Sequence, residues 1–453
     1  MRAINPATEE TVAEYPEHTW PQIEQACAAT RSAFALWRNT PLEQRCRLMR
    51  QAAALLRQRR SELAKLMTCE MGKPITAGEA EVDKCAAACD YFAQNATKFL
   101  APLEIASDAS RSYVRFEPLG PILAIMPWNF PLWQVFRFAA AALVAGNVVL
   151  LKHAPNVPGC ALAIERLAAE AGFPRGVLAA LLVSDNAVAE QIVSHPAIAA
   201  VTLTGSERAG SAVAAAAGRA LKKTVMELGG SDPFIVLADA DVPSVAAAAA
   251  QARCINNGQS CIAAKRFIVE APIAEEFESA LAAAMSAMKV GDPLDRATQI
   301  GPLARLDLLE NLHRQVQTSI DQGARLLCGG RRLPGKGFFY QPTVLADVHP
   351  GMAAFDEETF GPVAAVTRAV DVDDAIHLAN ESRYGLGVSL WTKNVDRAQA
   401  LAARLDGGCV FINGMVQSDP RLPFGGIKSS GWGRELSEFG MREFVNIKTV
   451  WVR

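Results

Sequence analysis

Two side chains in this chain of 453 residues stand in settings that suit a nucleophile and a general base. Cys261 follows Asn257-Gly258-Gln259-Ser260, and glycine and small polar residues before a cysteine favour an open loop over a packed helix. Most cysteines in such a chain are structural thiols, so this setting alone leaves both interpretations open. Glu227 ends an apolar segment and precedes Leu228-Gly229-Gly230, where a half-buried carboxylate suits a base, although a solvated glutamate is the common alternative.

Three further features suit an oxyanion or a phosphate. Asn129 lies in Pro127-Trp128-Asn129-Phe130-Pro131, where two prolines fix the backbone around a rigid amide donor; an ordinary turn asparagine is the alternative. Thr204–Gly210 follows an apolar run and opens a helical one, so its backbone N–H groups suit a phosphate, although the full GxGxxG motif is absent. Lys152 ends another apolar run and is a candidate for contact with a ribose or phosphate, or else a surface lysine.

The elements that must position these residues alternate between strands and helices. Residues 21–100 carry leucine and alanine at near-helical spacing, which predicts helices. From Pro121 onward, short apolar runs alternate with alanine-rich helical stretches, and the runs span 122–126, 148–151, 200–203 and 224–226. This rhythm predicts a parallel sheet with helices on both faces. Ligands bind beyond the carboxyl ends of such strands, so the polar clusters that end the four runs should converge at one edge.

A second α/β stretch runs from about residue 234 to residue 424. Its predicted strands lie at 234–237, 267–269, 363–367 and 410–413. Aromatic and β-branched residues at 110–117 and in the tail at 446–452 predict two more strands. A chain of this length exceeds one ordinary core, so the pattern indicates an α/β fold with more than one domain.

Composition excludes several classes of function. Lys and Arg number 45 against 47 Asp and Glu, so no basic excess exists to hold a nucleic acid. The first residues are polar, and the longest apolar run, 138–151, is shorter than the ~20 residues of a membrane span; we therefore expect a cytoplasmic protein without membrane contact. The ten cysteines, Cys85 and Cys89 included, form no metal-ligand pattern with histidine, so no metal is expected.

Taken together, these segments resemble the aldehyde dehydrogenase superfamily over nearly the whole chain. The matching stretches are Pro127–Pro131, Gly146–Lys152, Thr204–Gly210, Glu227–Gly230, Gly258–Cys261, Glu358–Pro362 and Pro423–Gly426. The resemblance implies a Rossmann-like NAD(P)-binding domain (1–103 and 119–228) and an α/β catalytic domain (229–430) that carries the nucleophilic cysteine. It also implies a small β oligomerisation element (104–118 and 431–453), whose exposed strand edges predict a homodimer or homotetramer.

The resemblance assigns a role to each of the three catalytic candidates. Cys261 would attack the aldehyde to form a thiohemiacetal, and hydride loss would then leave a thioester. The side-chain amide of Asn129 and the backbone N–H of Cys261 would hold the oxyanion. Glu227 would activate the water that hydrolyses the thioester. Relatives that pass the acyl group to coenzyme A tend to lack a carboxylate here, so Glu227 predicts the free acid as product.

A dinucleotide groove is implied in the same way. Ser206 would contact the pyrophosphate, Lys152 the adenosine ribose, and Glu358 with Phe360 the nicotinamide ribose. The full set of implied cofactor residues is Ile125, Met126, Pro127, Trp128, Lys152, Ala154, Pro155, Gly205, Ser206, Leu228, Gly229, Glu358 and Phe360. NAD-preferring members usually carry a glutamate where this chain has Pro155, so NAD and NADP both stay open. His153 is either a neighbour of a 2′-phosphate or a structural histidine.

By position, the implied substrate residues are Phe130, Gln134, Arg137, Ile262, Ser418 and Phe424. Arg137 lies in an apolar helical run, where an arginine needs a partner, and it suits a substrate carboxylate. The succinate-semialdehyde dehydrogenase subfamily has an arginine here and a serine at the place of Ser418. Its second arginine and second cysteine are replaced by Ile255 and Ala263, which predicts a one-arginine site without a disulfide switch. An internal salt bridge is the alternative for Arg137.

The predicted function is therefore NAD(P)-dependent oxidation of succinate semialdehyde to succinate. One alternative keeps the chemistry but acts on medium-chain or aromatic aldehydes. Another, of a different class, is a catalytically silent dinucleotide-binding protein. The presence of Cys261, Glu227 and Asn129 together argues against the silent alternative.

Overall fold

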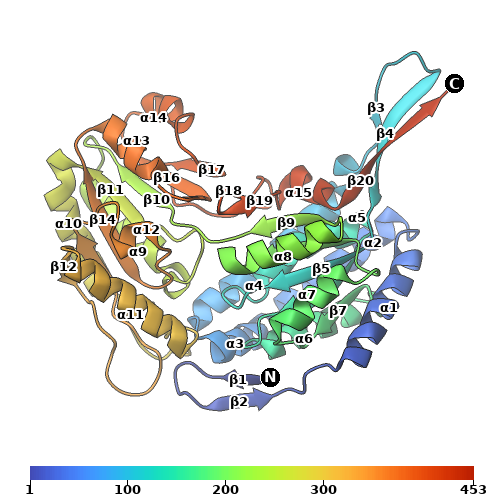
Figure 1. Ribbon diagram of the computed structural model, residues 1–453, viewed down its shortest axis with the longest axis horizontal. Coiled ribbons are helices and arrows are strands. Elements are labelled where there is room, and N and C mark those ends of the chain that lie inside the picture. Colours follow the sequence, from blue (N-terminus) through green and yellow to red (C-terminus); the bar gives the residue numbers. More distant parts are fainter.

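The computed structural model describes residues 1–453, which form two α/β lobes and a protruding β-arm (Figure 1). A short antiparallel pair, β1 (Arg2–Ile4) and β2 (Thr11–Glu14), opens the chain. The four helices that follow are α1 (Trp20–Trp37), α2 (Leu42–Gln58), α3 (Arg60–Met71) and α4 (Ile75–Phe99). Helices were predicted here, and on α2 the periodic residues Leu48, Ala52 and Leu56 are buried.

The first lobe is built around a six-stranded sheet. Its strands are β5 (Pro121–Met126), β6 (Val148–His153), β7 (Leu178–Leu181), β8 (Ala200–Thr204), β9 (Lys223–Glu227) and β19 (Gly431–Trp432). Their order is β19-β9-β8-β5-β6-β7, and every pair except β19–β9 is parallel. The helices that connect the parallel strands are α5 (Trp133–Ala145), α6 (Pro158–Glu170), α7 (Asn186–Ser194) and α8 (Glu207–Arg219). The four predicted strands are confirmed; β7 was not predicted.

The register of this sheet brings the polar clusters together. Ile125 pairs with Lys152 on one side and with Leu203 on the other, and Thr204 pairs with Glu227. The carboxyl ends of β5, β6, β8 and β9 therefore share one edge, as the pattern predicted.

The second lobe contains a seven-stranded sheet with helices on both faces (Figure 1). Its strands, in spatial order, are β12 (Arg325–Cys328), β13 (Thr343–Ala346), β14 (Val363–Ala369), β11 (Arg266–Glu270), β10 (Pro233–Val236), β16 (Gly387–Trp391) and β17 (Cys409–Ile412). The helices are α9 (Val242–Cys254), α10 (Ala271–Ser286), α11 (Leu306–Asp321), α12 (Ala353–Asp356), α13 (Val372–Asn380) and α14 (Val395–Ala402). All pairs except β12–β13 are parallel, so this lobe is also α/β.

A three-stranded antiparallel sheet projects from the body and contains the C-terminal strand (Figure 1). It consists of β3 (Leu103–Glu104), β4 (Arg111–Pro118) and β20 (Val445–Val452). Both strands predicted from aromatic and β-branched content lie in it. Within the predicted oligomerisation element, Gly431–Trp432 instead pairs with β9 of the first sheet, and α15 (Ser437–Glu443) leads into β20. None of the helices combines the length and the apolar composition that a membrane span requires.

Candidate active site

The loop before Cys261 is held in an unusual backbone conformation. A 3-10 turn, η1 (Ile255–Gly258), follows α9, and Asn256 and Asn257 in it have φ angles of 54° and 61°. Gly258 is also left-handed, and a methyl group there would come 2.3 Å from the backbone carbon of Gly361. Non-glycine residues at positive φ persist only where surrounding contacts hold them, and they concentrate at functional sites.

Those contacts are hydrogen bonds from the two asparagine side chains. The Nδ2 of Asn256 donates to the backbone oxygen of Asn129 at 2.7 Å and to that of Gln259 at 3.1 Å. Asn257 donates to the carbonyl oxygens of Gly72 and Pro302 and accepts from the N–H of Gly301 at 2.8 Å. The loop is thereby tied to the segment that carries Asn129.

Lys265, which is fully buried, donates hydrogen bonds to backbone carbonyl oxygens at and around Cys261. The Nζ of Lys265 donates to the carbonyl oxygens of Ser260, Cys261 and Ala263 at 3.0, 2.8 and 3.1 Å. A methyl group at Gly230 would come 2.6 Å from the same carbonyl oxygen of Cys261, so only glycine fits there. The backbone of the nucleophile is therefore fixed from two sides.

The thiol of Cys261 is held in its neutral form in this environment. Burial raises its pKa to about 12, against the opposing charges of Arg137 and Lys265. A neutral thiol is a weak nucleophile, so attack on an aldehyde requires that its proton be removed.

Asn129 lies beside the nucleophile loop, as expected for a donor to an oxyanion. Its side-chain Nδ2 donates one hydrogen to the carbonyl oxygen of Gln259 at 3.1 Å, which leaves its second hydrogen for another acceptor. The side chain is 4% exposed, and its Oδ1 has no hydrogen-bond partner. Asn129 and Cys261 line the same cavity.

Glu227 lies at the end of β9 and is not part of the lining of either cavity described below. Its Oε1 has no hydrogen-bond partner, and a methyl group at Gly425 would come 2.8 Å from it. Burial raises the pKa of the Glu227 carboxyl well above its usual range, while the nearby charge of Arg137 opposes this shift. The structure thus places Cys261 and Asn129 together and Glu227 in the adjacent buried cluster around Arg137.

One cavity follows the carboxyl edge of the first sheet and matches the expected cofactor groove. Its lining includes eight of the implied residues, Pro127, Trp128, Gly205, Ser206, Leu228, Gly229, Glu358 and Phe360. It also includes seven residues not assigned to it from sequence: Asn129, Gln134, Thr204, Cys261, Arg305, Leu308 and Asn311. Ile125, Met126, Lys152, Ala154 and Pro155 lie on β5 and on β6 and the loop after it, outside this lining.

The groove offers groups that fit a dinucleotide. Ser206 is the N-cap of α8, so the free N–H groups of that helix open into the groove. Trp128 and Phe360 form an edge-to-face pair with ring centroids 5.7 Å apart. Glu358 accepts from the N–H of Gly230 through Oε1 at 3.0 Å and pairs with Lys265 through the same oxygen, and neither contact uses its Oε2.

At the end of β6 the two neighbouring polar residues differ. Lys152 is 7% exposed, and burial lowers the pKa of its ammonium; no protein acceptor bonds its Nζ. His153 is buried with both ring nitrogens occupied, by the Pro131 carbonyl oxygen and the Ala154 N–H, each at 2.8 Å. Burial lowers the pKa of His153 to about 4. The contacts of His153 therefore fit a structural histidine, whereas the Lys152 ammonium still has hydrogen-bond donors free for a ligand.

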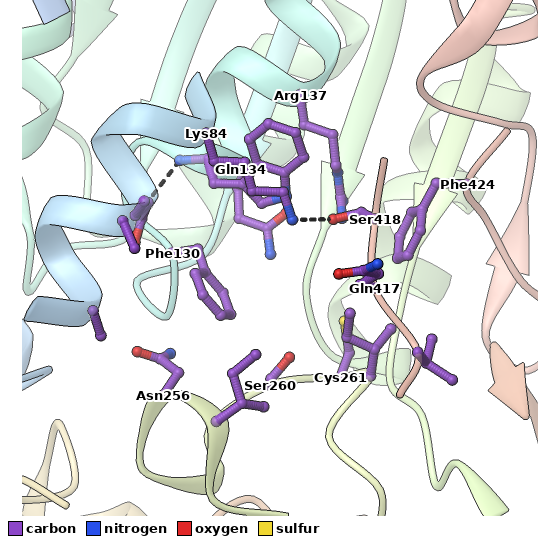
Figure 2. A pocket seen from close by; sticks show the side chains of 17 residues that line it. Lys84, Phe130, Gln134, Arg137, Asn256, Ser260, Cys261, Gln417, Ser418 and Phe424 are labelled. Atoms are coloured by element: carbon purple, nitrogen blue, oxygen red, sulfur yellow. Dashed lines mark hydrogen bonds between the residues drawn. The ribbon is translucent and has the colours of Figure 1, made fainter. Parts of the chain in front are cut away.

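A second cavity meets the groove at Cys261 and contains all six implied substrate residues: Phe130, Gln134, Arg137, Ile262, Ser418 and Phe424 (Figure 2). Its volume is about 210 Å³, below the ~300 Å³ at which drug-sized ligand pockets begin, which favours a small aldehyde. Sequence reasoning missed one wall entirely, which Ala77, Ala80, Glu81 and Lys84 of α4 supply. The only signal was their helical spacing, and it does not say which face of α4 meets the site.

Arg137 lines this cavity but already has a carboxylate partner. Its Nε forms an ion pair with Glu435, and both side chains are 2% exposed. Its Nη2 donates to Thr204 at 3.2 Å, and its guanidinium lies over the ring of Phe424 at 4.7 Å. Although burial opposes it, Glu435 raises the pKa of Arg137. The internal salt bridge that sequence reasoning left open is therefore present.

Comparison with known proteins places this geometry in a family. The model of the aldehyde dehydrogenase family matches residues 1–450. This chain belongs to the aldehyde dehydrogenase family, and its fold is the one expected from the sequence resemblance.

Individual relatives are similar along their whole length. A probable succinate-semialdehyde dehydrogenase (NADP+) of Synechocystis sp. is 51% identical, with 100% of this chain and 99% of that protein covered. A succinate semialdehyde dehydrogenase (NAD(P)+) of Escherichia coli is 50% identical, with 99% and 97% covered. The crystal structure of succinic semialdehyde dehydrogenase from Streptococcus pyogenes in complex with NADP+ has a TM-score of 0.97 at 37% identity, with 100% and 99% covered.

Proposed function

We propose that this protein oxidises succinate semialdehyde to succinate, with NAD or NADP as the hydride acceptor and Cys261 as the nucleophile. One observation carries the proposal: Cys261 lines both the groove that fits a dinucleotide and the small cavity that fits an aldehyde. A thiol at that junction can reach a carbonyl carbon in one cavity and present the hydrogen on it to the other.

In the first step the Cys261 thiol releases its proton to solvent water, the thiolate sulfur bonds to the aldehyde carbon, and the carbonyl oxygen becomes an oxyanion. The free hydrogen of the Asn129 amide and the backbone N–H of Cys261 donate to that oxygen. Because Asn129 and Lys265 hold this loop rigidly, the two donors need no rearrangement as charge develops. The bound nicotinamide ring supplies the acceptor for the hydride, and a thioester remains on Cys261.

Glu227 is the proposed base for hydrolysis. Burial raises the pKa of its carboxyl well above the usual range, which makes the ionised form a stronger base toward water. The charge of Arg137 beside it opposes this shift and favours the ionised form. The oxygen of the water then bonds to the thioester carbon, the sulfur leaves, and the carboxylic acid is released.

Cofactor assignment follows from the groove and from the relatives. Ser206 at the start of α8 would bind the pyrophosphate, Lys152 the adenosine ribose, and Glu358 a nicotinamide ribose hydroxyl. The other implied residues on β5 and in the loop after β6, namely Ile125, Met126, Ala154 and Pro155, would complete the adenosine end. Relatives named for NADP+ and for NAD(P)+ support the use of either cofactor.

The choice of aldehyde rests on the relatives' names and on charge in the cavity. Full-length relatives at about 50% identity are named for succinate semialdehyde. Basic side chains from α4 and α5 line the cavity together with Ser418, which suits a substrate with a carboxylate at its far end.

We further propose a division into a cofactor domain (1–103 and 119–228), a catalytic domain (229–430) and an oligomerisation element (104–118 and 431–453). The β-arm exposes apolar side chains at Leu103, Ile105, Ile447 and Trp451, which supports a homodimer or homotetramer. All ten cysteines are unpaired, which suits a reducing cytoplasm. Light scattering on the purified protein gives the assembly.

The proposed function is tested by steady-state kinetics with succinate semialdehyde, hexanal and benzaldehyde, each with NAD and with NADP. We expect kcat/KM for the semialdehyde to exceed that for the other two by at least about tenfold, the effect of one charge-assisted contact. Equal or higher values for hexanal or benzaldehyde would favour the alternative substrates. No reduction of either cofactor with any aldehyde would favour a silent binding protein.

A further inference from the structure

The cavity wall from α4 carries a cation that no sequence motif assigned. Ala80, Glu81 and Lys84 follow Ala77 by three, four and seven residues, so the four side chains share one face of α4, and all four line the cavity. Lys84 is half-buried there, with its Nζ 4.4 Å from the centre of the Trp133 ring.

The ammonium of Lys84 has one hydrogen-bond partner and no ion-pair partner in the protein. Its Nζ donates to the Oγ of Ser418 at 2.7 Å, and no carboxylate lies within 4.0 Å. Figure 2 shows this bond as a dashed line that joins α4 to the segment before Phe424, above Cys261 in the view. Two ammonium hydrogens and the hydroxyl hydrogen of Ser418 remain for a ligand.

Every other charge at this end of the cavity is already matched. Glu81 forms an ion pair with Lys73 and accepts two backbone N–H groups, both at 2.9 Å. Arg137 is paired with Glu435. Asp419, next to Ser418 in the chain, is bound by Arg421 at 2.5 Å. The cavity therefore carries one unmatched positive charge, and that charge belongs to Lys84.

The surroundings of Lys84 disfavour its charged form. Burial and, next, the charge of Arg137 lower the pKa of its ammonium to about 8, with Glu81, Cys85 and Asp419 as the opposing neighbours. An anion placed against Lys84 offsets the lowering of its pKa, because the opposite charge favours the ammonium form in a partly desolvated site.

From this charge balance we propose that Lys84, together with the hydroxyl of Ser418, binds the carboxylate of the substrate and sets the preference for an aldehyde with a remote acid group. The proposal rests on the proposed function and deepens it. Arg137, whose Nε is paired with Glu435, then shapes the wall and contacts the ring of Phe424. The arrangement differs from the one-arginine site expected from the sequence.

The test is the ratio of kcat/KM for succinate semialdehyde to kcat/KM for butanal, which has the same chain length without the acid. Lys84→Met should lower this ratio on the order of 10- to 100-fold, through a raised KM for the semialdehyde, because a charge-assisted bond is lost. Lys84→Arg keeps the charge and should restore most of the ratio. Lys98→Met, on the exposed last turn of α4, is the matched control and should leave the ratio unchanged.

An equilibrium measurement separates binding from turnover. Succinate should inhibit wild-type enzyme as a product, and its inhibition constant should rise in Lys84→Met by about the factor lost in the ratio. Lys84→Gln gives a second uncharged variant if the methionine variant folds poorly, which thermal unfolding would show.

The outcomes separate the two proposals. If wild type prefers the semialdehyde and Lys84→Met keeps both the ratio and the succinate inhibition, the assignment of Lys84 is wrong while the proposed function stands. The same holds if Arg137→Met loses the ratio and Lys84→Met does not. If wild type shows no preference over butanal, the proposed function fails and the role of Lys84 fails with it.

Discussion

The two cavities that meet at Cys261 are built from different kinds of element. The cofactor groove is lined by residues that follow β5, β8 and β9, together with groups from the second lobe such as Glu358. The substrate cavity is lined by faces of α4 and α5 and by the nucleophile loop and the segment at 416–418. The groove therefore depends on where strands end, and the cavity on which helix faces meet.

This difference suggests how each cavity can vary. Strand ends in a parallel sheet are fixed by backbone hydrogen bonds, so the groove keeps its shape whatever side chains surround it. A helix face presents side chains alone, so one substitution on α4 changes the charge of the cavity without disturbing its frame. Variants in the groove should therefore alter cofactor kinetics, and variants in the cavity should alter aldehyde selectivity.

The largest loss of activity is expected at Cys261, where the groove and the cavity meet. Cys261→Ser should lower kcat by at least about 10⁴-fold, because the nucleophile is lost, while fluorescence titration shows cofactor binding largely retained. Cys328→Ser, at a half-buried position on β12, is the matched control and should keep wild-type turnover. Surviving turnover in Cys261→Ser would mean that the nucleophile is misassigned.

A smaller effect should isolate the groove. Lys152→Ala should raise the KM for the cofactor on the order of tenfold, since a buried ammonium without a protein acceptor loses its ligand contact. The ratio of activity on succinate semialdehyde to that on butanal should not change. Lys65→Ala, at an exposed position on α3, provides the control. A changed aldehyde ratio in Lys152→Ala would contradict the separation of the two regions.

The smallest effect is expected from a change of pH, which should alter aldehyde selectivity through the charge of Lys84. The pKa of Lys84 is lowered to about 8, so its ammonium is charged below that pH and neutral above it. The semialdehyde-to-butanal ratio of kcat/KM should stay constant below pH 8 and fall about tenfold per unit above it. Ionisation of Cys261 affects both substrates equally and cancels in the ratio. Lys84→Met should give a flat ratio, and a flat ratio in wild type would argue against a titrating lysine.

The same contrast explains what sequence could predict. Apolar runs followed by polar clusters predicted four of the strands and placed Asn129, Ser206 and Glu227 at one edge. This was possible because a buried parallel strand is a continuous apolar run in the sequence, and the residues at its end follow directly. The four-residue strand β7 was missed, since Leu-Ala-Ala-Leu is too short and too alanine-rich to stand out.

The sequence could not predict which helix faces line the cavity or which residues far apart in the chain form ion pairs. Periodicity gave α4 as a helix, but only the packing of α4 on α5 shows that Lys84 enters the cavity. Likewise Arg137 could be read as needing a partner, but nothing local identifies Glu435, which lies in a different part of the chain. The resting position of Glu227 beside Gly425 also depends on contacts that no motif encodes.

The central claim, an acyl group carried on Cys261 at the junction of the two cavities, can be observed directly. Glu227→Gln should form the thioester but hydrolyse it slowly, so acid quenching after mixing with succinate semialdehyde and cofactor should trap it. Peptide mass spectrometry should then find one succinyl group on the peptide that contains Cys261. A succinyl group on another cysteine, such as Cys409, or none at all despite a burst of reduced cofactor, would contradict the account.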